Sequence, residues 1–389
     1  MIPNCIHRHY AAGLARNTSI FAGIASHRNR GRALVVAAAH NIPSIHNIPS
    51  PSVAASRRTL SSSSSPRDRP TTRRPSTRTV VAFSAAISSA FLLYTASQQT
   101  RTMSSKLIPA NPADVMVIRD ITPNVTTLSV PFARYGRFEV GGRCTVVRMT
   151  NGGVMLFSPV AYTPEAVAVV SRLGGDKGVR YIVAPDIEHH IFISEWAKAF
   201  PNARIIGPQG LPEKRAETKG KDPKINTDDK FFAVLADKYA QPSTPQSIAP
   251  DFDADFGLVY FDMHPNKEIV LFFRPDNVLI QADLMFNLPA VEQYARVDAS
   301  QRTGAPGHAN FLNRLFQSFM KTEGDVTWAR RFQWYAASKA NRPRFSEAVH
   351  VIDGWPFEVI IPCHGETIEH DAKATFRKVF QWHLDSKTA

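Results

Sequence analysis

Short apolar runs bounded by turn residues recur from about residue 115 to the C-terminus, and they predict strands interspersed with helices. The clearest pair of runs, Cys144–Met149 and Val154–Phe157, flanks Asn151-Gly152, a dipeptide typical of a tight hairpin turn. After this hairpin, Thr163 and Pro164 predict the N-cap and the first position of a helix. The pattern therefore predicts an α/β protein.

A loop rich in potential metal ligands follows the apolar run 181–184. The four residues with metal-binding atoms are Asp186, Glu188, His189 and His190. Three large apolar residues come next at a spacing of four, which places them on one face of a helix: Phe192, Trp196 and Phe200. Open α/β sheets usually have their sites at the carboxyl ends of such strands. Alternatively, Asp186 and Glu188 cap the following helix, because acids are favoured at a helix N-terminus.

The remainder of the chain predicts further elements in order. Residues 211–250 are polar and predict a loop with one helix around Phe231–Ala236. Three apolar runs then predict consecutive strands: Leu258–Phe261, Glu268–Phe273 and Val278–Gln281. Residues 308–353 predict helices rich in aromatic side chains, and we expect the aromatic-rich segment 308–357 to cover the site. A last strand, Phe357–Ile361, and a C-terminal helix complete the chain.

The positive charge of the chain is concentrated in its first 104 residues. This leader holds 13 Arg, no Lys and one acid, a charge of +12, so only +1 of the total +13 belongs to residues 105–389. A near-neutral folded part does not support a basic nucleic-acid surface. We therefore expect a small-molecule substrate and no nucleic acid. The chain divides into a leader, 1–104, and a folded domain, 105–389.

The composition of the leader predicts disorder and a targeting role. It is rich in Arg, Ser and Pro, which is the composition of a mitochondrial transit peptide. Residues 80–96 are uncharged and apolar but shorter than a usual membrane span. They are either a weak membrane anchor or part of the presequence. Met103 is a candidate second start of translation, which would leave a cytoplasmic form.

Candidate metal ligands stand at four predicted strand ends. They are His189 and His190, then His264, then Asp283, then His364. Imidazoles and a carboxylate bind zinc, or iron and manganese when oxygen ligands increase, and a catalytic site needs about three such ligands. Each residue also has a structural interpretation: His264 as a turn residue, Asp283 as a partner of loop amides. Adjacent histidines point in different directions, so we expect one of His189 and His190 to face the site.

These motifs resemble the metallo-β-lactamase fold superfamily, and within it the DUF4336 group. The resemblance spans about residues 115–385 and rests on the His-His pair and three later segments: Met263-His264-Pro265, Gln281–Phe286 and Ile361–Gly365. It implies a four-layer αββα sandwich. The pattern of the family is His-x-His-x-Asp-His, a single His, a bridging Asp and a last His. The last His of the first motif aligns with His190, and the single His aligns with His264. The bridging Asp aligns with Asp283, and the last His of the pattern with His364.

The chain departs from the family pattern in the first motif. Pro185 and Ile187 replace its first two histidines, and His189 replaces its Asp. The resemblance therefore implies one metal rather than two, with zinc expected and iron as the alternative. We expect the ligands to be His190, Asp283 and His364, with His189 or His264 added.

The expected function is a metal-dependent hydrolase of esters, thioesters, lactones or amides, in which a metal-bound water attacks the carbonyl. Asp283 would orient that water or act as the acid/base. Two other hypotheses are a non-catalytic descendant with a vestigial or ligand-binding site, and an iron-dependent oxidoreductase or sulfur-handling enzyme. Metal content separates the first hypothesis from the second, and metal identity separates it from the third.

Overall fold

The computed structural model describes residues 112–298 and 308–386. The leader and its apolar stretch 80–96 lie outside these residues. Within the described part, no helix has both the length and the apolar character that a membrane crossing requires.

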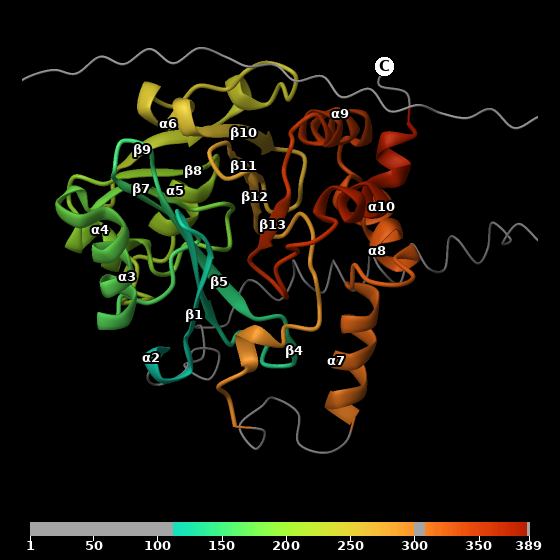
Figure 1. Ribbon diagram of the computed structural model, residues 1–389, viewed down its shortest axis with the longest axis horizontal. Helices are drawn as coiled ribbons and strands as arrows, with labels where there is room; N and C mark the ends of the chain where they lie inside the picture. The colour runs from blue at the N-terminus through green and yellow to red at the C-terminus, as the bar shows by residue number, and fades with distance from the viewer. Residues whose placement is uncertain (1–111, 299–307, 387–389) are drawn as a thin grey trace, which may run out of the picture. The chain divides into compact units, whose positions relative to one another are not determined.

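Two β-sheets form the centre of the fold (Figure 1). The strands of the larger sheet, in spatial order, are β1 (Val117–Thr122), β2 (Val125–Val130), β5 (Gly142–Arg148), β6 (Val154–Phe157), β7 (Val179–Val183), β8 (Arg204–Pro208) and β9 (Phe231–Leu235). Its first four strands are antiparallel, and β6 to β9 are parallel. A two-stranded ribbon, β3 (Ala133–Arg134) and β4 (Phe138–Glu139), lies in the chain between β2 and β5.

The smaller sheet has four strands. In spatial order they are β10 (Phe256–Phe261), β11 (Glu268–Phe273), β12 (Val278–Gln281) and β13 (Val359–Pro362). The first three are antiparallel neighbours, whereas β13 pairs with β12 in parallel. The carboxyl ends of β12 and β13 therefore lie at the same edge, which brings residues 282–286 beside residues 363–365.

Helices cover the outer faces of the two sheets (Figure 1). On the larger sheet these are α3 (Pro164–Gly174), α4 (Ile193–Ala199) and α5 (Leu211–Ala216). On the smaller sheet they are α8 (Thr327–Phe332), continued by a π-helical turn (Gln333–Ala337), α9 (Arg342–Asp353) and α10 (Ala372–Leu384). The remaining α-helices of the described residues are α2 (Pro112–Val115), α6 (Pro250–Asp255) and α7 (His308–Phe319), and a short 3-10 helix spans Glu292–Tyr294.

Three apolar layers hold these elements together. Phe157 and Tyr181 meet Tyr260 and Phe273 between the sheets, and all four are fully buried. Trp196 lies in the layer outside the larger sheet, while the third layer packs α8 to α10 on the smaller sheet. Buried apolar area is the main favourable term in folding, so both faces of both sheets contribute to stability. The predicted αββα sandwich is confirmed.

Most of the local predictions are confirmed. β5 and β6 form the expected hairpin, and the hydroxyl of Thr163 caps α3 by accepting a hydrogen bond from the backbone N–H of Ala166 at 3.3 Å. The helix after the ligand-rich loop forms as α4, with Trp196 buried and its indole N–H donating to the carbonyl of Val160 at 2.7 Å.

Two predictions are wrong. The segment expected to be helical around residue 231 is the edge strand β9, in which Ala233 pairs with Ile206 of β8. A five-residue apolar run is too short to support a helix, and pairing with the sheet satisfies its backbone. Most of the aromatic segment 308–357 does not cover the site, because α8 and α9 bury Phe345 and Ile352 against the outer face of the smaller sheet.

Candidate metal site

Three side chains with metal-binding atoms meet where the two sheets end. His189 lies in the loop after β7, Asp283 follows β12, and His364 follows β13. One ligand atom from each residue lies within 4.8 Å of the other two. Nε2 of His364 lies 3.0 Å from Oδ1 of Asp283 and 3.2 Å from Nε2 of His189. We call these three residues the ligand group.

The loop after β7 is built around the buried carboxylate of Asp186. Its Oδ1 accepts hydrogen bonds from the backbone N–H groups of Glu188 and His189, at 2.7 and 2.8 Å. Its Oδ2 accepts from Nδ1 of His189 at 2.8 Å. Asp186 therefore closes a turn rather than capping α4, whose N-cap, Phe192, makes no side-chain capping bond. Because Nδ1 of His189 donates to Asp186, Nε2 is the atom that is left to bind a proton or a metal ion.

The tautomer of His364 is fixed in the same way. Its Nδ1 lies 2.6 Å from the carbonyl oxygen of Gly141, which can only accept a hydrogen bond. Nδ1 therefore carries the proton, and Nε2 is free to bind a metal. The imidazole stacks on Phe286 with an interplanar angle of 7° and also on Phe132. These contacts restrict its rotation and shield it from water.

Asp283 is held by two neighbours in the smaller sheet. The side-chain amide of Asn266 donates to its Oδ2, and the carboxyl of Glu268 accepts from its backbone N–H at 2.9 Å. Burial favours the neutral acid, but the contact with His364 and the charge of His189 hold the pKa of Asp283 well below its usual range. Burial, together with the charge of Asp283, raises the pKa of Glu268.

This donor set fits a single metal ion. Among the described residues, no donor makes a hydrogen bond of normal geometry to the buried Oδ1 of Asp283, and the two Nε2 atoms lie 3.2 Å apart, so a proton or a metal ion is needed between them. Two ligands of a tetrahedral zinc ion lie roughly 3.3 Å apart, close to the separations found here. Although burial opposes it, Asp186 raises the pKa of His189 to about 9, so a proton and a metal compete for the same space.

His190 does not join the ligand group, contrary to the sequence prediction. Its Nδ1 lies 3.4 Å from Nη1 of Arg215, which also donates to the backbone carbonyl of His190 at 2.8 Å. Burial and the cations Lys214 and Arg215 lower the pKa of His190 to about 3. Of the two adjacent histidines, His189 is the one that faces the site.

His264 also lies outside the ligand group, although it is buried nearby. Its Nδ1 accepts a hydrogen bond from the backbone N–H of Asn266 at 3.3 Å, and burial lowers its pKa. The neutral ring therefore carries its proton on Nε2. This arrangement matches the turn interpretation, because His264 shapes the turn that places Asn266 against Asp283.

Comparison with known proteins places this geometry in context. Residues 136–210 match the family model described as "Domain of unknown function (DUF4336)". Similar solved structures include a metallo-β-lactamase from Pontibacter korlensis, with 11% identity, 70% of this chain and 100% of that chain covered, and a TM-score of 0.41. The FIM-1 metallo-β-lactamase from Pseudomonas aeruginosa, in its mono-zinc form, has 14% identity and a TM-score of 0.40, with 69% of this chain and 94% of that chain covered. The metal-soaked Flv1 flavodiiron core from Synechocystis has 11% identity and a TM-score of 0.44, with 69% of this chain and 60% of that chain covered.

The chain is similar to these proteins in its arrangement of two sheets covered by helices. The DUF4336 match bears out the resemblance found in the sequence over residues 136–210 of the folded domain. Comparison with curated protein sequences gives no match.

Sequence reasoning missed several residues that support the candidate metal site. Glu268 and Arg143 are fully buried ionisable residues that contact its loops. Each has a sequence signal, because Glu268 opens an otherwise apolar strand and Arg143 stands between a Gly-Gly pair and an apolar run. A charge inside a buried strand is rare unless it is paired, so such positions point to polar partners.

Proposed function

We propose that this protein is a mononuclear metal-dependent hydrolase acting on a small ester, thioester or lactone. The observation that carries the proposal is the ligand group itself. Two imidazoles whose Nδ1 atoms are held by hydrogen bonds and one ionised carboxylate direct two Nε2 atoms and a carboxylate oxygen to a common point. That arrangement is costly without a cation or proton between the atoms.

The chain residues have distinct roles in this proposal. His189, Asp283 and His364 would hold the ion, with zinc expected and iron as the alternative. When bound, the metal supplies Lewis-acid activation of a water molecule and of the substrate carbonyl. Asp283, held as an ionised carboxylate, would hold the ion and orient the attacking water, while Phe132 and Phe286 exclude bulk water from His364. His189 keeps 14% of its side chain exposed, which leaves an approach for substrate.

The proposal has one metal ion because the residues that would bind a second ion are not in the ligand group. His190 and His264, which the family pattern assigns as ligands, are engaged elsewhere. With Pro185 and Ile187 at the other two positions, no further described histidine is available to complete a second centre beside the first.

The test is hydrolysis of a panel of aryl esters, acyl thioesters and lactones by the full chain. We expect turnover that a chelator abolishes and one equivalent of zinc restores. Asp283→Ala should lower kcat/KM by about 10²–10⁴-fold, the usual contribution of a group that positions or transfers a proton. His190→Ala is the matched control and should retain turnover.

A zinc-loaded, folded chain that hydrolyses no member of the panel would contradict the hydrolase proposal and favour the non-catalytic alternative. Turnover that is unchanged in Asp283→Ala would contradict the role of this carboxylate.

A further inference from the structure

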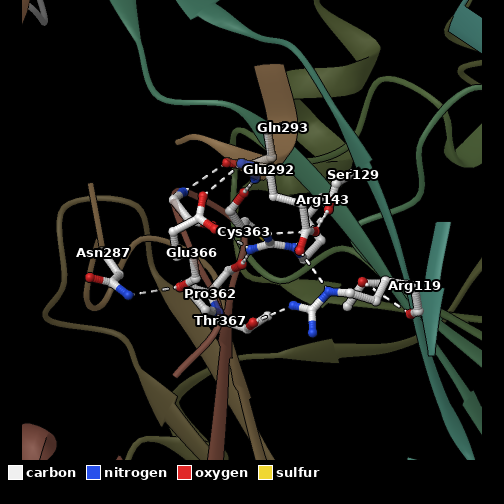
Figure 2. A network of polar contacts seen from close by, with 12 residues as sticks. Arg119, Ser129, Arg143, Asn287, Glu292, Gln293, Pro362, Cys363, Glu366 and Thr367 are labelled. Carbon is white, nitrogen blue, oxygen red and sulfur yellow. Dashed lines mark hydrogen bonds and ion pairs between the residues drawn. The ribbon is translucent and has the colours of Figure 1, made fainter. Parts of the chain in front are cut away.

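Arg143 is a fully buried cation that binds the turn carrying His364 (Figure 2). Its Nη1 donates to the carbonyl oxygens of Pro362 and Gly365, at 2.6 and 2.7 Å. These two carbonyls flank His364 on either side. Burying a guanidinium is unfavourable unless its donors are satisfied, so this turn and Arg143 depend on each other.

Gln293 binds other backbone groups of the same turn (Figure 2). Its amide N–H₂ donates to the carbonyl of Cys363 at 2.8 Å, and its Oε1 accepts from the backbone N–H of Gly365 at 2.9 Å. It also packs directly on Gly141, where a Cβ atom would collide with the glutamine side chain. Gly141 is the residue whose carbonyl fixes the tautomer of His364. Gln293 therefore contacts Gly141 and both chain neighbours of His364.

Glu292 supplies the counter-charge for Arg143. Its Oε1 lies 3.3 Å from Nη2 of Arg143 and accepts from the hydroxyl of Ser129 at 2.6 Å, while its Oε2 pairs with Arg119 at 2.7 Å. Burial raises the pKa of Glu292, but Arg143 and the other partners lower it more, so the group is ionised. Glu292 and Gln293 are consecutive, so one short helical turn delivers both contacts.

We propose that Arg143 and Gln293 are positioning residues of the candidate metal site. They hold residues 362–365 in place, so that Nδ1–H of His364 stays hydrogen-bonded to the carbonyl of Gly141 and Nε2 points to the metal. The inference rests on the proposed function for its metal, but the orientation of His364 can be measured without one. Such supporting contacts typically change metal affinity by about 10–100-fold.

The test uses the full chain and two variants, Arg143→Lys and Gln293→Leu. Arg143 also donates from Nε to the hydroxyl of Ser129 at 3.0 Å. Lysine keeps the buried charge but cannot reach this hydroxyl and both carbonyls together. Leucine removes both hydrogen bonds of Gln293 with little change in volume. The first readout is the ¹⁵N NMR signature of the His364 ring in metal-free protein, assigned by its loss in His364→Gln. We expect an Nδ1–H tautomer in the wild type and a mixed tautomer in both variants.

The second readout is zinc affinity by competition with a chelator, which should fall about 10–100-fold in both variants. Val349→Ala, in the core on the outer face of the smaller sheet, is the control for lost stability and should change neither readout. An unchanged His364 tautomer in both folded variants would overturn the inference, whatever the zinc affinity. A changed tautomer with no zinc binding even in the wild type would support the positioning role and contradict the proposed function.

Discussion

At the residue scale, the identity of the ligands depends on which way each polar side chain points. His189 and His190 are adjacent and have the same chemistry, so spacing alone does not choose between them. The choice is made by Asp186, which binds Nδ1 of His189, and by Arg215, which binds the carbonyl of His190. These partners come from the loop and from α5, respectively, and a pattern of residue types along the chain does not contain such contacts.

The role of Asp186 leads to a first prediction. Asp186→Asn removes the charge that holds His189 and should weaken zinc binding by about 10–100-fold. The measurement is chelator competition on the full chain. Glu188→Gln is the matched control, because Glu188 lies in the same loop but pairs with Lys214 at 2.9 Å. Equal losses of affinity in both variants would argue against a specific role for Asp186.

His383 leads to a prediction on pH and stability. This buried ring lies beside Ser346, with Nδ1 and Oγ 2.8 Å apart, and burial lowers its pKa to about 4. Its unfolded pKa is about 6.5, so the unfolded state binds more protons between these values. The stability contribution of the neutral ring is present above pH 6.5 and is lost as the pH falls toward 4.

Urea unfolding at pH 7 and pH 5 measures this effect. From His383 alone we expect a loss of about 2 kcal/mol between the two pH values. His383→Gln should reduce the pH dependence by that amount. An identical pH dependence in the wild type and the variant would contradict the assignment.

At the scale of elements, sequence patterns predicted what depends on neighbouring residues in the chain. The Asn151-Gly152 hairpin and the start of α3 follow from local turn and cap chemistry. The edge strand β9 does not, because its five residues become a strand by pairing with β8. The outward packing of α8 and α9 also depends on the completed sheet. Local sequence patterns therefore predicted most of the helices and strands, while tertiary contacts determined the segments whose patterns were ambiguous.

The cap of α3 gives a prediction at this scale. Thr163→Ala removes the hydroxyl that accepts from Ala166 and should lower the free energy of unfolding by about 1 kcal/mol. Ser171→Ala, at an exposed position of the same helix, is the control and should be neutral or slightly stabilising. Chemical unfolding at constant pH measures both, and a neutral Thr163→Ala would show that the cap contributes nothing.

At the scale of the whole molecule, the sandwich brings together residues that are distant in the chain. The parallel pairing of β12 and β13 sets Asp283 beside His364, and the loop after β7 adds His189 from the other sheet. A hydrogen bond from Ile269 to the carbonyl of Pro185, at 2.6 Å, joins that loop to β11. The family order of motifs predicted this meeting point. Only the folded structure shows that His189, and not His190, belongs to the ligand group.

The measurement that tests this account most directly is the metal content of the full chain, purified without a chelator or a histidine tag. We predict about one zinc or iron per chain in the wild type and in His190→Ala, and none in the double variant His189→Ala/His364→Ala, with folding checked by circular dichroism. A folded wild type without metal would contradict the account. So would metal that persists in the double variant, or that is lost when only His190 is replaced.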